Sequence, residues 1–338
     1  MKQILPLLLL VCLAAAPDAS FSAASDAALL WWTRVLPSLL PYLIAVSLLE
    51  RSDLFFRLPK RIAPLLLLPL GAIGGYPAGA KLAGRLYRDG ALTLRNARRA
   101  ALAASLPNPV FLYSVVAVGT FHDPRAAIPP LIGIYGPALF GAIPMLRVSL
   151  QTVPLPGGAF SAQALPDAIR DGVRSILMIG GCLVFAAVLG ALIGASGLLS
   201  LFGTYAAFAR AILLGVCEMT CGVQAAAALS LPVAVRLALC AFFAQFGGVS
   251  VGLQCASHLP VSFSRWFAVR FVTGAIAAIA VYLLSLALVP EPVASVFASK
   301  DAIVRNAADL ASVALASGFG LLLIFVFTAG SKKRKKTP

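Results

Sequence analysis

Long apolar segments recur along almost the whole of this 338-residue chain. Sixty per cent of its residues are hydrophobic and only 12% are charged, a balance that no soluble domain of this size tolerates. A hydrophobic run of about 20 residues is long enough to cross a bilayer as an α-helix. The sequence therefore predicts an all-α, polytopic membrane protein.

Basic residues give the chain a formal net charge of +15 and lie mainly in short connections between the apolar runs. They form no surface module in which basic and aromatic residues alternate, so we expect no nucleic-acid partner. The positive-inside rule instead places the connections at 51–61 and 85–99, together with the C-terminal KKRKK, in the cytoplasm. The charge pattern thus indicates topology in a lipid bilayer.

The stretch GGYPAG at residues 74–79 interrupts an apolar segment whose two flanking connections are both basic. Residues 62–75 and 76–88 form legs of about 14 residues, or about 21 Å of helix, which are too short for a hydrocarbon core of about 30 Å. Since both ends belong on one side, we predict a re-entrant hairpin with its tip at GGYPAG. A further break follows at Pro107-Asn108-Pro109, where two missing backbone donors exclude a regular helix.

The second half of the chain repeats this order of interruptions. GVCEMTCGVQ at residues 215–224 predicts a second re-entrant hairpin, and Gly247-Gly248 predicts a second broken helix. Because the two halves enter the membrane from opposite faces, we interpret them as an inverted repeat, an arrangement typical of secondary transporters. The expected parts are an N-terminal transmembrane helix at 1–28, for which a cleaved signal segment is the alternative, a first repeat at 29–150, a cytoplasmic linker with an amphipathic helix at 151–172, a second repeat at 173–290, and a C-terminal transmembrane helix with a basic cytoplasmic tail at 300–338.

Interrupted helices point to a binding site. Unpaired backbone groups survive in a membrane only where protein or a water-filled cavity surrounds them. Four interruptions at similar depth predict one cavity near the midplane, where half-helix N-termini present N–H groups to an anion. The alternative is that each glycine or proline serves only close packing or a kink. The candidate substrate-binding residues are Gly74, Gly75, Tyr76, Pro77, Gly79, Lys81, Asn108, Pro109, Glu218, Thr220, Gly222, Gln224, Gly247, Gly248, Ser250 and Gln254.

Two charged residues lie close to the predicted hairpin tips. Lys81 either serves the substrate or a gate, or extends to the cytoplasmic headgroups. Glu218 has three interpretations: coupling of transport to a proton or sodium ion, pairing with Lys81, or acceptance of hydrogen bonds from the hairpin backbone. The two histidines and six cysteines lack metal-ligand spacing, so we expect neither a metal site nor a cofactor.

Five blocks in the sequence carry a family resemblance. They are LLWWTRVLPSLLPYLIAVSLL (29–49), GGYPAGAKLAGRL (74–86), SLPNPVFLYSVVAVGTF (105–121), GVCEMTCGVQAA (215–226) and FGGVSVGLQCAS (246–257). In this order they resemble the signature segments of the sporulation integral membrane proteins of the YlbJ type, also called SpoVV, which are built on Gate-type nucleoside recognition repeats. Pro107, where relatives usually have a small polar residue, and the apolar Leu253 before Gln254 depart from the family pattern.

The resemblance implies a function in endospore formation. Proteins of this type are expected in the outer forespore membrane, where they move dipicolinic acid from the mother cell toward the forespore, and their layout is similar to that of concentrative nucleoside transporters. A nucleoside or other small-solute transporter is one alternative, and a non-transporting sporulation receptor or assembly protein is another. A membrane enzyme is disfavoured, because Glu218 has no second carboxylate beside it and no Ser/His arrangement accompanies it.

Overall fold

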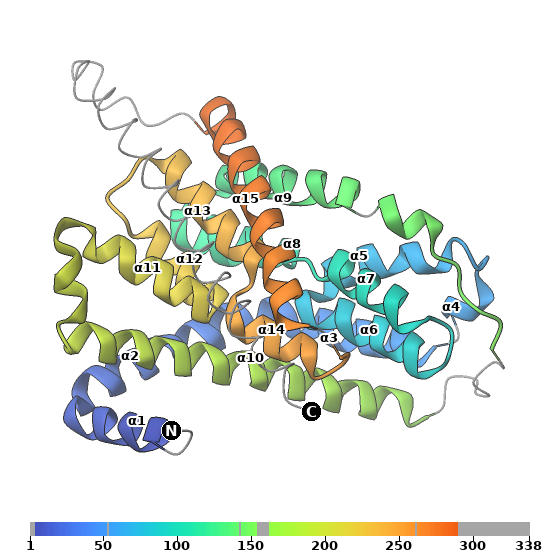
Figure 1. Ribbon diagram of the computed structural model, residues 1–338, viewed down its shortest axis with the longest axis horizontal. Helices are drawn as coiled ribbons and strands as arrows, with labels where there is room; N and C mark the ends of the chain where they lie inside the picture. The colour runs from blue at the N-terminus through green and yellow to red at the C-terminus, as the bar shows by residue number, and fades with distance from the viewer. Residues whose placement is uncertain (1–3, 53, 142, 154–161, 261, 290–338) are drawn as a thin grey trace, which may run out of the picture.

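The computed structural model describes residues 4–52, 54–141, 143–153, 162–260 and 262–289 (Figure 1). Within these residues every regular element is a helix, as the composition predicts. Seven helices among them are long and apolar enough to cross a membrane: Pro17–Arg51, Leu94–Phe121, Pro124–Arg147, Ala164–Ala195, Leu198–Cys217, Val233–Ala256 and Phe263–Leu288. The helix and basic tail expected at 300–338 lie outside the described residues.

The N-terminal region differs from the prediction of one transmembrane helix over residues 1–28. Helix α1 (Ile4–Ala15) stops before Pro17, whose ring disfavours helical geometry at Ala16. With 12 residues, α1 is about 18 Å long and cannot cross the bilayer core by itself. A continuous helix of 35 residues follows, made of α2 (Pro17–Leu30), the π-helical turn η1 (Trp31–Val35) and α3 (Leu36–Arg51). The expected boundary at residue 28 therefore lies inside a helix.

The rest of the first half contains the first two interruptions. Its elements are α4 (Leu54–Arg57), η2 (Ala63–Leu66), α5 (Leu67–Gly74), α6 (Tyr76–Arg88), α7 (Leu94–Ala104), α8 (Pro109–Phe111), η3 (Leu112–Phe121), η4 (Pro124–Ala127), α9 (Ile128–Gly141) and η5 (Ile143–Arg147). Only Gly75 separates α5 from α6, whereas residues 105–108 between α7 and α8 form no helix. Helices thus end and begin at GGYPAG and at the Pro-Asn-Pro sequence.

The second half contains the other two interruptions, each one residue long. Its elements are α10 (Ala164–Ala195), η6 (Leu198–Tyr205), α11 (Ala206–Cys217), α12 (Met219–Ala227), α13 (Val233–Phe246), α14 (Gly248–Ala256) and α15 (Phe263–Leu288). Glu218 has extended backbone between α11 and α12, and Gly247 is left-handed between α13 and α14. Helix α10 runs through the expected linker boundary at residue 172, so the amphipathic segment and the following span are one helix.

The helices on either side of Gly75 and of Glu218 fold back on each other as two helical hairpins. In the second hairpin, a Cβ atom added to Gly222 would lie 2.2 Å from the Cα atom of Gly215 on the other leg. In the first hairpin, Cβ atoms added to Gly71 or Gly79 would lie 2.0 or 2.4 Å from the Ala104 carbonyl oxygen of α7. Small residues therefore allow backbones to touch, which is the usual way in which membrane helices pack closely.

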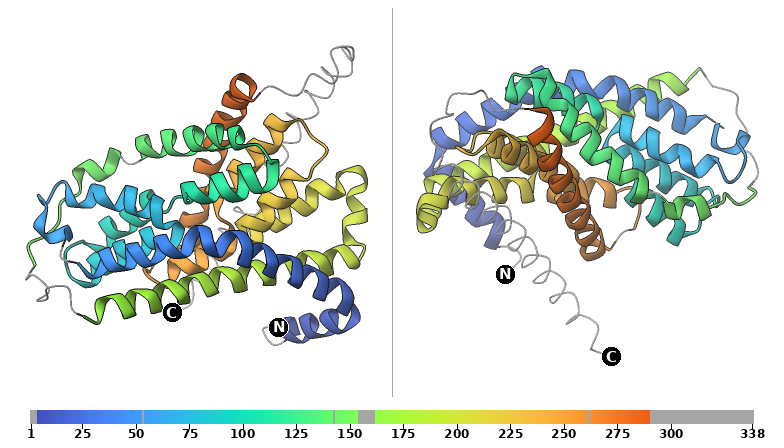
Figure 2. Two further views of the ribbon diagram at one scale, coloured as in Figure 1. Left: turned by 180° about the vertical axis from the view of Figure 1, so that it is seen from behind. Right: turned by 90° about the horizontal axis from the view of Figure 1, so that it is seen from above.

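Buried side chains form two clusters beside these hairpins. One cluster includes Leu82 of α6 and Trp266 of α15, and the other includes Val223 of α12 and Phe243 of α13. Met219, at the tip of the second hairpin, packs against both. The long helix α10 lies along α2 and α3, and α15 packs against α9 and α13 (Figure 2). The hairpin tips are therefore enclosed within the molecule.

Candidate functional site

The interruptions surround one small cavity of about 40 Å³, which has room for a few water molecules. Three interruptions contribute residues directly, and the second turn of α14, which follows the fourth interruption, contributes two more. The lining residues are Val35, Leu39, Gly74, Gly75, Tyr76, Pro77, Asn108, Phe111, Ile179, Glu218, Met219, Thr220, Val251 and Gln254. The tips of both hairpins thus meet the start of α8 at a common point.

Half of the candidate residues lie in this lining, namely Gly74, Gly75, Tyr76, Pro77, Asn108, Glu218, Thr220 and Gln254. The structure gives several others packing positions: Gly79 contacts Ala104, Gly222 contacts Gly215, and Gly248 lies against the carbonyl end of α11. The remaining positions are Pro109 as the first residue of α8, Gly247 as the left-handed residue before α14, Ser250 buried on α14, Gln224 half-buried on α12, and Lys81 in an ionic cluster.

The tip of the first hairpin depends on an unusual backbone conformation. Gly75 has φ 77° and ψ −176°, a region that residues with a Cβ atom essentially do not occupy. Space is not the constraint, because the nearest atom to an added Cβ would be the Asn108 Cβ at 3.8 Å. No side chain caps the N-terminus of α6, so its first N–H groups are not satisfied in that way. Glycine here lets the backbone itself form part of the cavity wall.

Side chains satisfy carbonyl groups that the first hairpin and the first broken helix leave without helical partners. Asn108 donates its amide to the Ile73 carbonyl of the first hairpin and accepts from the backbone N–H of Val110 at 2.6 Å. The buried Arg270 guanidinium donates to the carbonyls of Leu102 and Ser105. The Tyr135 hydroxyl donates to the Pro107 carbonyl at 2.5 Å. Each freed carbonyl in hydrocarbon would otherwise cost several kcal/mol, so these contacts maintain the break.

Arg270 also connects this break to the cavity. Its guanidinium lies 5.3 Å from the ring centroid of Tyr76, a cavity residue, and 5.0 Å from that of Trp266. A positive charge near the last carbonyls of α7 is favourable because the C-terminus of a helix carries partial negative charge. Our sequence analysis missed Arg270, although an arginine one to two turns inside the apolar run at 264–289 is the kind of signal that marks a buried role.

Glu218 performs one of its three predicted roles. Its Oε2 accepts a hydrogen bond of 2.8 Å from the backbone N–H of Cys221, which caps α12 at the tip of the second hairpin. The residue is only 3% exposed and lines the cavity. A carboxylate at a helix N-terminus is stabilised by the free N–H groups and the helix dipole. The prediction of an acceptor for hairpin backbone is therefore confirmed.

Lys81 lies outside the cavity lining, in a cluster that joins α3, α6 and α10. Its Nζ is 2.8 Å from Glu50 Oε2 and 3.3 Å from Asp171 Oδ2, and Arg51 contacts the same Asp171 oxygen at 2.8 Å. Ser47 Oγ lies 3.2 Å from Lys81 Nζ. The predicted pair with Glu218 is therefore wrong, because the carboxylate partners of Lys81 come from two other helices. The sequence does not reveal this pairing, because Glu50 is the last residue of an apolar run and Asp171 lies in the expected linker.

Lys81→Met is expected to lower the free energy of unfolding by roughly 2–4 kcal/mol, because the substitution leaves the Glu50 carboxylate without its nearest cation. The Lys81 and Glu50 side chains are only 18% and 10% exposed, so water replaces little of the lost interaction. The thermal midpoint of the purified protein measures the effect. Adding Glu50→Gln should recover much of the loss, and Lys60→Met, at an exposed lysine that contacts Thr152, is the control. A midpoint equally low in the control would contradict this role for Lys81.

Comparison with known proteins gives one relative. The chain is similar to the sporulation integral membrane protein YlbJ of Bacillus subtilis (strain 168), with 26% identity over an alignment 360 residues long, which covers 91% of this chain and 87% of the relative. This similarity confirms the resemblance to the YlbJ type. No family model matches the chain, and no solved structure matches it. The relative's name and the seven apolar helices together identify an integral, multi-pass membrane protein.

Proposed function

We propose that this chain, a relative of the YlbJ-type sporulation integral membrane proteins, transports a small organic anion across its membrane. The substrate that we expect is dipicolinate, moved from the mother cell toward the forespore across the outer forespore membrane. The observation that carries the proposal is the meeting of both hairpin tips with two other interrupted helices at one buried cavity. Interrupted helices that meet between inverted repeats are the usual construction of a transporter site.

The helix starts at the cavity favour an anion. Helix α6 begins there without a side-chain cap, and α8 and α12 begin there with caps from Asn108 and Glu218. An uncapped N-terminus presents free N–H groups and about half a positive charge. Dipicolinate carries two carboxylates, each of which needs hydrogen-bond donors in a site without water. At the uncapped start of α6, Pro77 has no N–H and the Ala78 N–H donates to the Gly75 carbonyl, so the Tyr76 N–H is the donor that we propose for the anion.

The cavity is too small to hold the substrate, so the proposed transport requires a conformational change. Small-molecule pockets typically hold about 300–1,000 Å³, whereas this cavity holds about 40 Å³. A bound solute therefore requires the hairpin tips to separate, and we propose that the two inverted repeats move relative to each other around this point. We further propose that the protein is not an enzyme, since the described lining contains one carboxylate and no histidine or lysine.

Glu218 is the group that we propose for coupling to protons. Its buried carboxylate lies in the same wall as the proposed anion site, so its negative charge opposes the substrate and protonation removes that opposition. Uptake is therefore expected to rise as pH falls on the substrate side. Glu218→Gln, which keeps an acceptor oxygen for the Cys221 N–H, should transport with little dependence on pH. An unchanged pH dependence in this variant would exclude Glu218 as the coupling group and leave sodium to be tested by ion replacement.

Uptake of radiolabelled dipicolinate and nucleoside into liposomes that contain the purified full-length protein tests the proposed function. We expect saturable uptake of dipicolinate above that of protein-free liposomes, and little uptake of nucleoside. The opposite preference would favour the nucleoside transporter. Binding without uptake would favour a receptor. If the protein neither binds nor takes up either solute, the proposal is overturned.

A further inference from the structure

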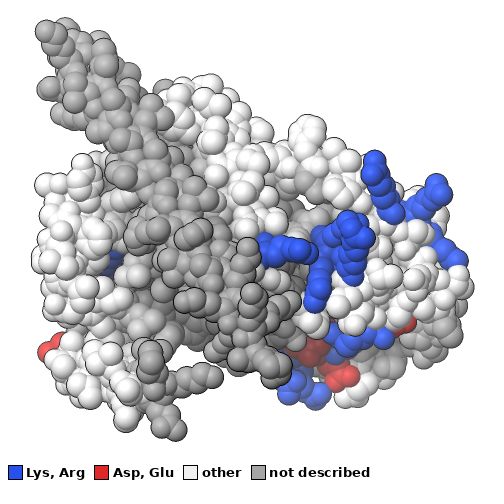
Figure 3. Space-filling model, viewed as in Figure 1, with Lys and Arg blue, Asp and Glu red and all other residues white. Residues whose placement is uncertain are grey.

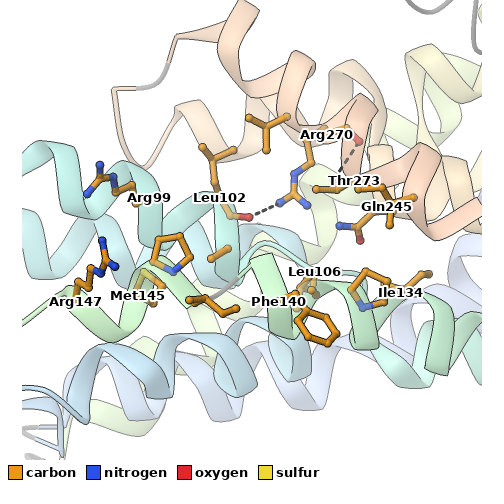
Figure 4. A pocket seen from close by; sticks show the side chains of 17 residues that line it. Arg99, Leu102, Leu106, Ile134, Phe140, Met145, Arg147, Gln245, Arg270 and Thr273 are labelled. Carbon is orange, nitrogen blue, oxygen red and sulfur yellow. Dashed lines mark hydrogen bonds between the residues drawn. The ribbon is translucent and has the colours of Figure 1, made fainter. Parts of the chain in front are cut away.

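A second, much larger pocket of about 970 Å³ lies beside the first broken helix, between α7, α9, η5, α13 and α15. Figure 4 shows Arg99 and Arg147 at one end of it and Arg270, Thr273 and Gln245 toward the other. Figure 4 shows the apolar Leu102 between these groups, and Leu106, Phe140 and Ile134 below Arg270 and Gln245. The pocket therefore offers polar contacts at two places and a hydrocarbon-like middle.

The polar rim of this pocket is strongly basic. A neighbouring pocket of about 470 Å³ shares Arg99 and is also lined by Arg95, Arg98 and Arg265. The described lining of both pockets contains no acidic residue. Within the described part of the chain Arg95, Arg99, Arg147 and Arg265 form no ion pair, since the salt bridges there involve other residues. Lysine and arginine side chains accordingly gather over one end of the molecule (Figure 3).

The inner part of the pocket contains buried polar atoms without partners. Arg270 and Gln245 are 1% and 4% exposed, and in the described part of the chain Arg270 Nε and Gln245 Oε1 have no hydrogen-bond partner. Buried groups of this kind normally have a partner, so an occupant with polar atoms is expected here. The same pocket is open to the surface where a membrane would lie, because Phe140, Ile143 and Ile276 are 75%, 54% and 45% exposed.

We propose that an acidic phospholipid binds in this pocket. Its phosphate lies between Arg99 and Arg147, and an acyl chain lies along the apolar middle formed by Leu106, Ile134 and Phe140. An ester oxygen of the lipid accepts a hydrogen bond from the Arg270 Nε–H; Gln245 Oε1 is itself an acceptor, so an ester does not satisfy it. Basic pockets between membrane helices are suited to anionic headgroups, and the exposed apolar rim admits a chain from the bilayer.

Negative charge and apolar surface together distinguish an acidic phospholipid from three other occupants. The C-terminal sequence KKRKK is itself basic and would be repelled by the arginines. A free inorganic anion would use the arginines but not the apolar middle, which would remain uncovered. A phospholipid of net negative charge satisfies both parts, and a zwitterionic lipid of the same chain length satisfies only the second.

Equilibrium binding of phosphatidylglycerol with a fluorescent acyl chain to the purified full-length protein, in nonionic detergent, tests the proposal. We expect unlabelled phosphatidylglycerol to displace the probe at a concentration at least about tenfold lower than phosphatidylcholine. Inorganic phosphate and dipicolinate should not displace it. The double variant Arg99→Gln/Arg147→Gln should weaken binding about tenfold or more, and Ala138→Trp, which fills the apolar part without changing charge, should also weaken it.

The matched control is Arg61→Gln/Arg174→Gln, which removes two exposed arginines that line neither pocket. Binding by the control should stay within about twofold of the parent protein. Equal displacement by phosphatidylcholine would overturn the proposal in favour of a non-specific apolar groove. Displacement by inorganic phosphate or dipicolinate, or unchanged binding in the Arg99/Arg147 variant, would overturn it as well. Arg270 is not varied because it also maintains the broken helix.

Discussion

Replacing Gly75 by alanine is expected to reduce dipicolinate uptake about 5- to 150-fold. At φ 77° and ψ −176°, Gly75 occupies backbone geometry that costs an alanine about 1–3 kcal/mol. Space is available for the added methyl group, so the effect comes from the backbone conformation. To relieve the strain, the first hairpin must turn its tip, which moves the Gly74 and Tyr76 backbone in the cavity wall.

Gly197→Ala is the matched control for this prediction. Gly197 also has a positive φ of 72°, an added Cβ would meet nothing within 4 Å, and the residue lies after α10, outside the cavity. Both variants should lose some stability, but only Gly75→Ala should lose uptake when equal amounts of folded protein are compared. Equal uptake by the two variants would show that the tip conformation does not matter for transport.

Asn108→Ala is expected to impair both the fold and transport, because one side chain joins the first hairpin to the first broken helix. Loss of the cap on α8 costs about 1 kcal/mol, and the Ile73 carbonyl left without a donor costs a further 1–3 kcal/mol or so. Asn108 is 3% exposed, so bulk water does not reach its amide directly. We expect a lowered thermal midpoint and uptake reduced by about tenfold or more in folded protein.

Asn108→Asp separates the two contacts of this residue. Aspartate retains the oxygen that accepts from Val110 but lacks the amide that donates to Ile73, and it adds a negative charge to the proposed anion site. Its uptake should therefore be as low as that of Asn108→Ala, although the cap on α8 is kept. Asn96→Ala, which truncates a half-buried asparagine outside the lining, serves as the control. Full uptake by Asn108→Asp would argue against a role for the amide.

Much of the fold could be predicted from local features. Apolar runs indicate membrane helices, and the helices stop at GGYPAG, Pro107-Asn108-Pro109, Glu218 and Gly247 as the interruptions suggest. A proline by itself does not predict a break. Pro41 lies inside α3 without ending it, whereas Pro17 follows the end of α1 and is the first residue of α2. Proline at the start of a helix is tolerated because no helical N–H is required there, so its position relative to the helix decides the outcome.

The candidate site was predicted in part. Gly75, Asn108 and Glu218 line the cavity at three interruptions, whereas Gly247 and Gly248 at the fourth do not. Among candidate residues further along a helix, Gln254 lines the cavity, but Gly79 and Gln224 do not. A helix has 3.6 residues per turn, so a residue several positions after a hairpin tip can point away from the cavity and toward whichever helix packs on that side. The apolar wall from Val35, Leu39 and Ile179 could not be predicted, because no local signal distinguishes these residues from others in their helices.

The sequence by itself determined where the helices stop, because a missing N–H group or a glycine with positive φ acts on its own stretch of backbone. Only the tertiary structure decided which charges meet and which breaks share a cavity. Lys81 contacts Asp171 across 90 positions of sequence, and Arg270 reaches the Ser105 carbonyl across 165. Contacts of this kind depend on how helices rotate and pack against each other, and that packing is a property of all the buried side chains together.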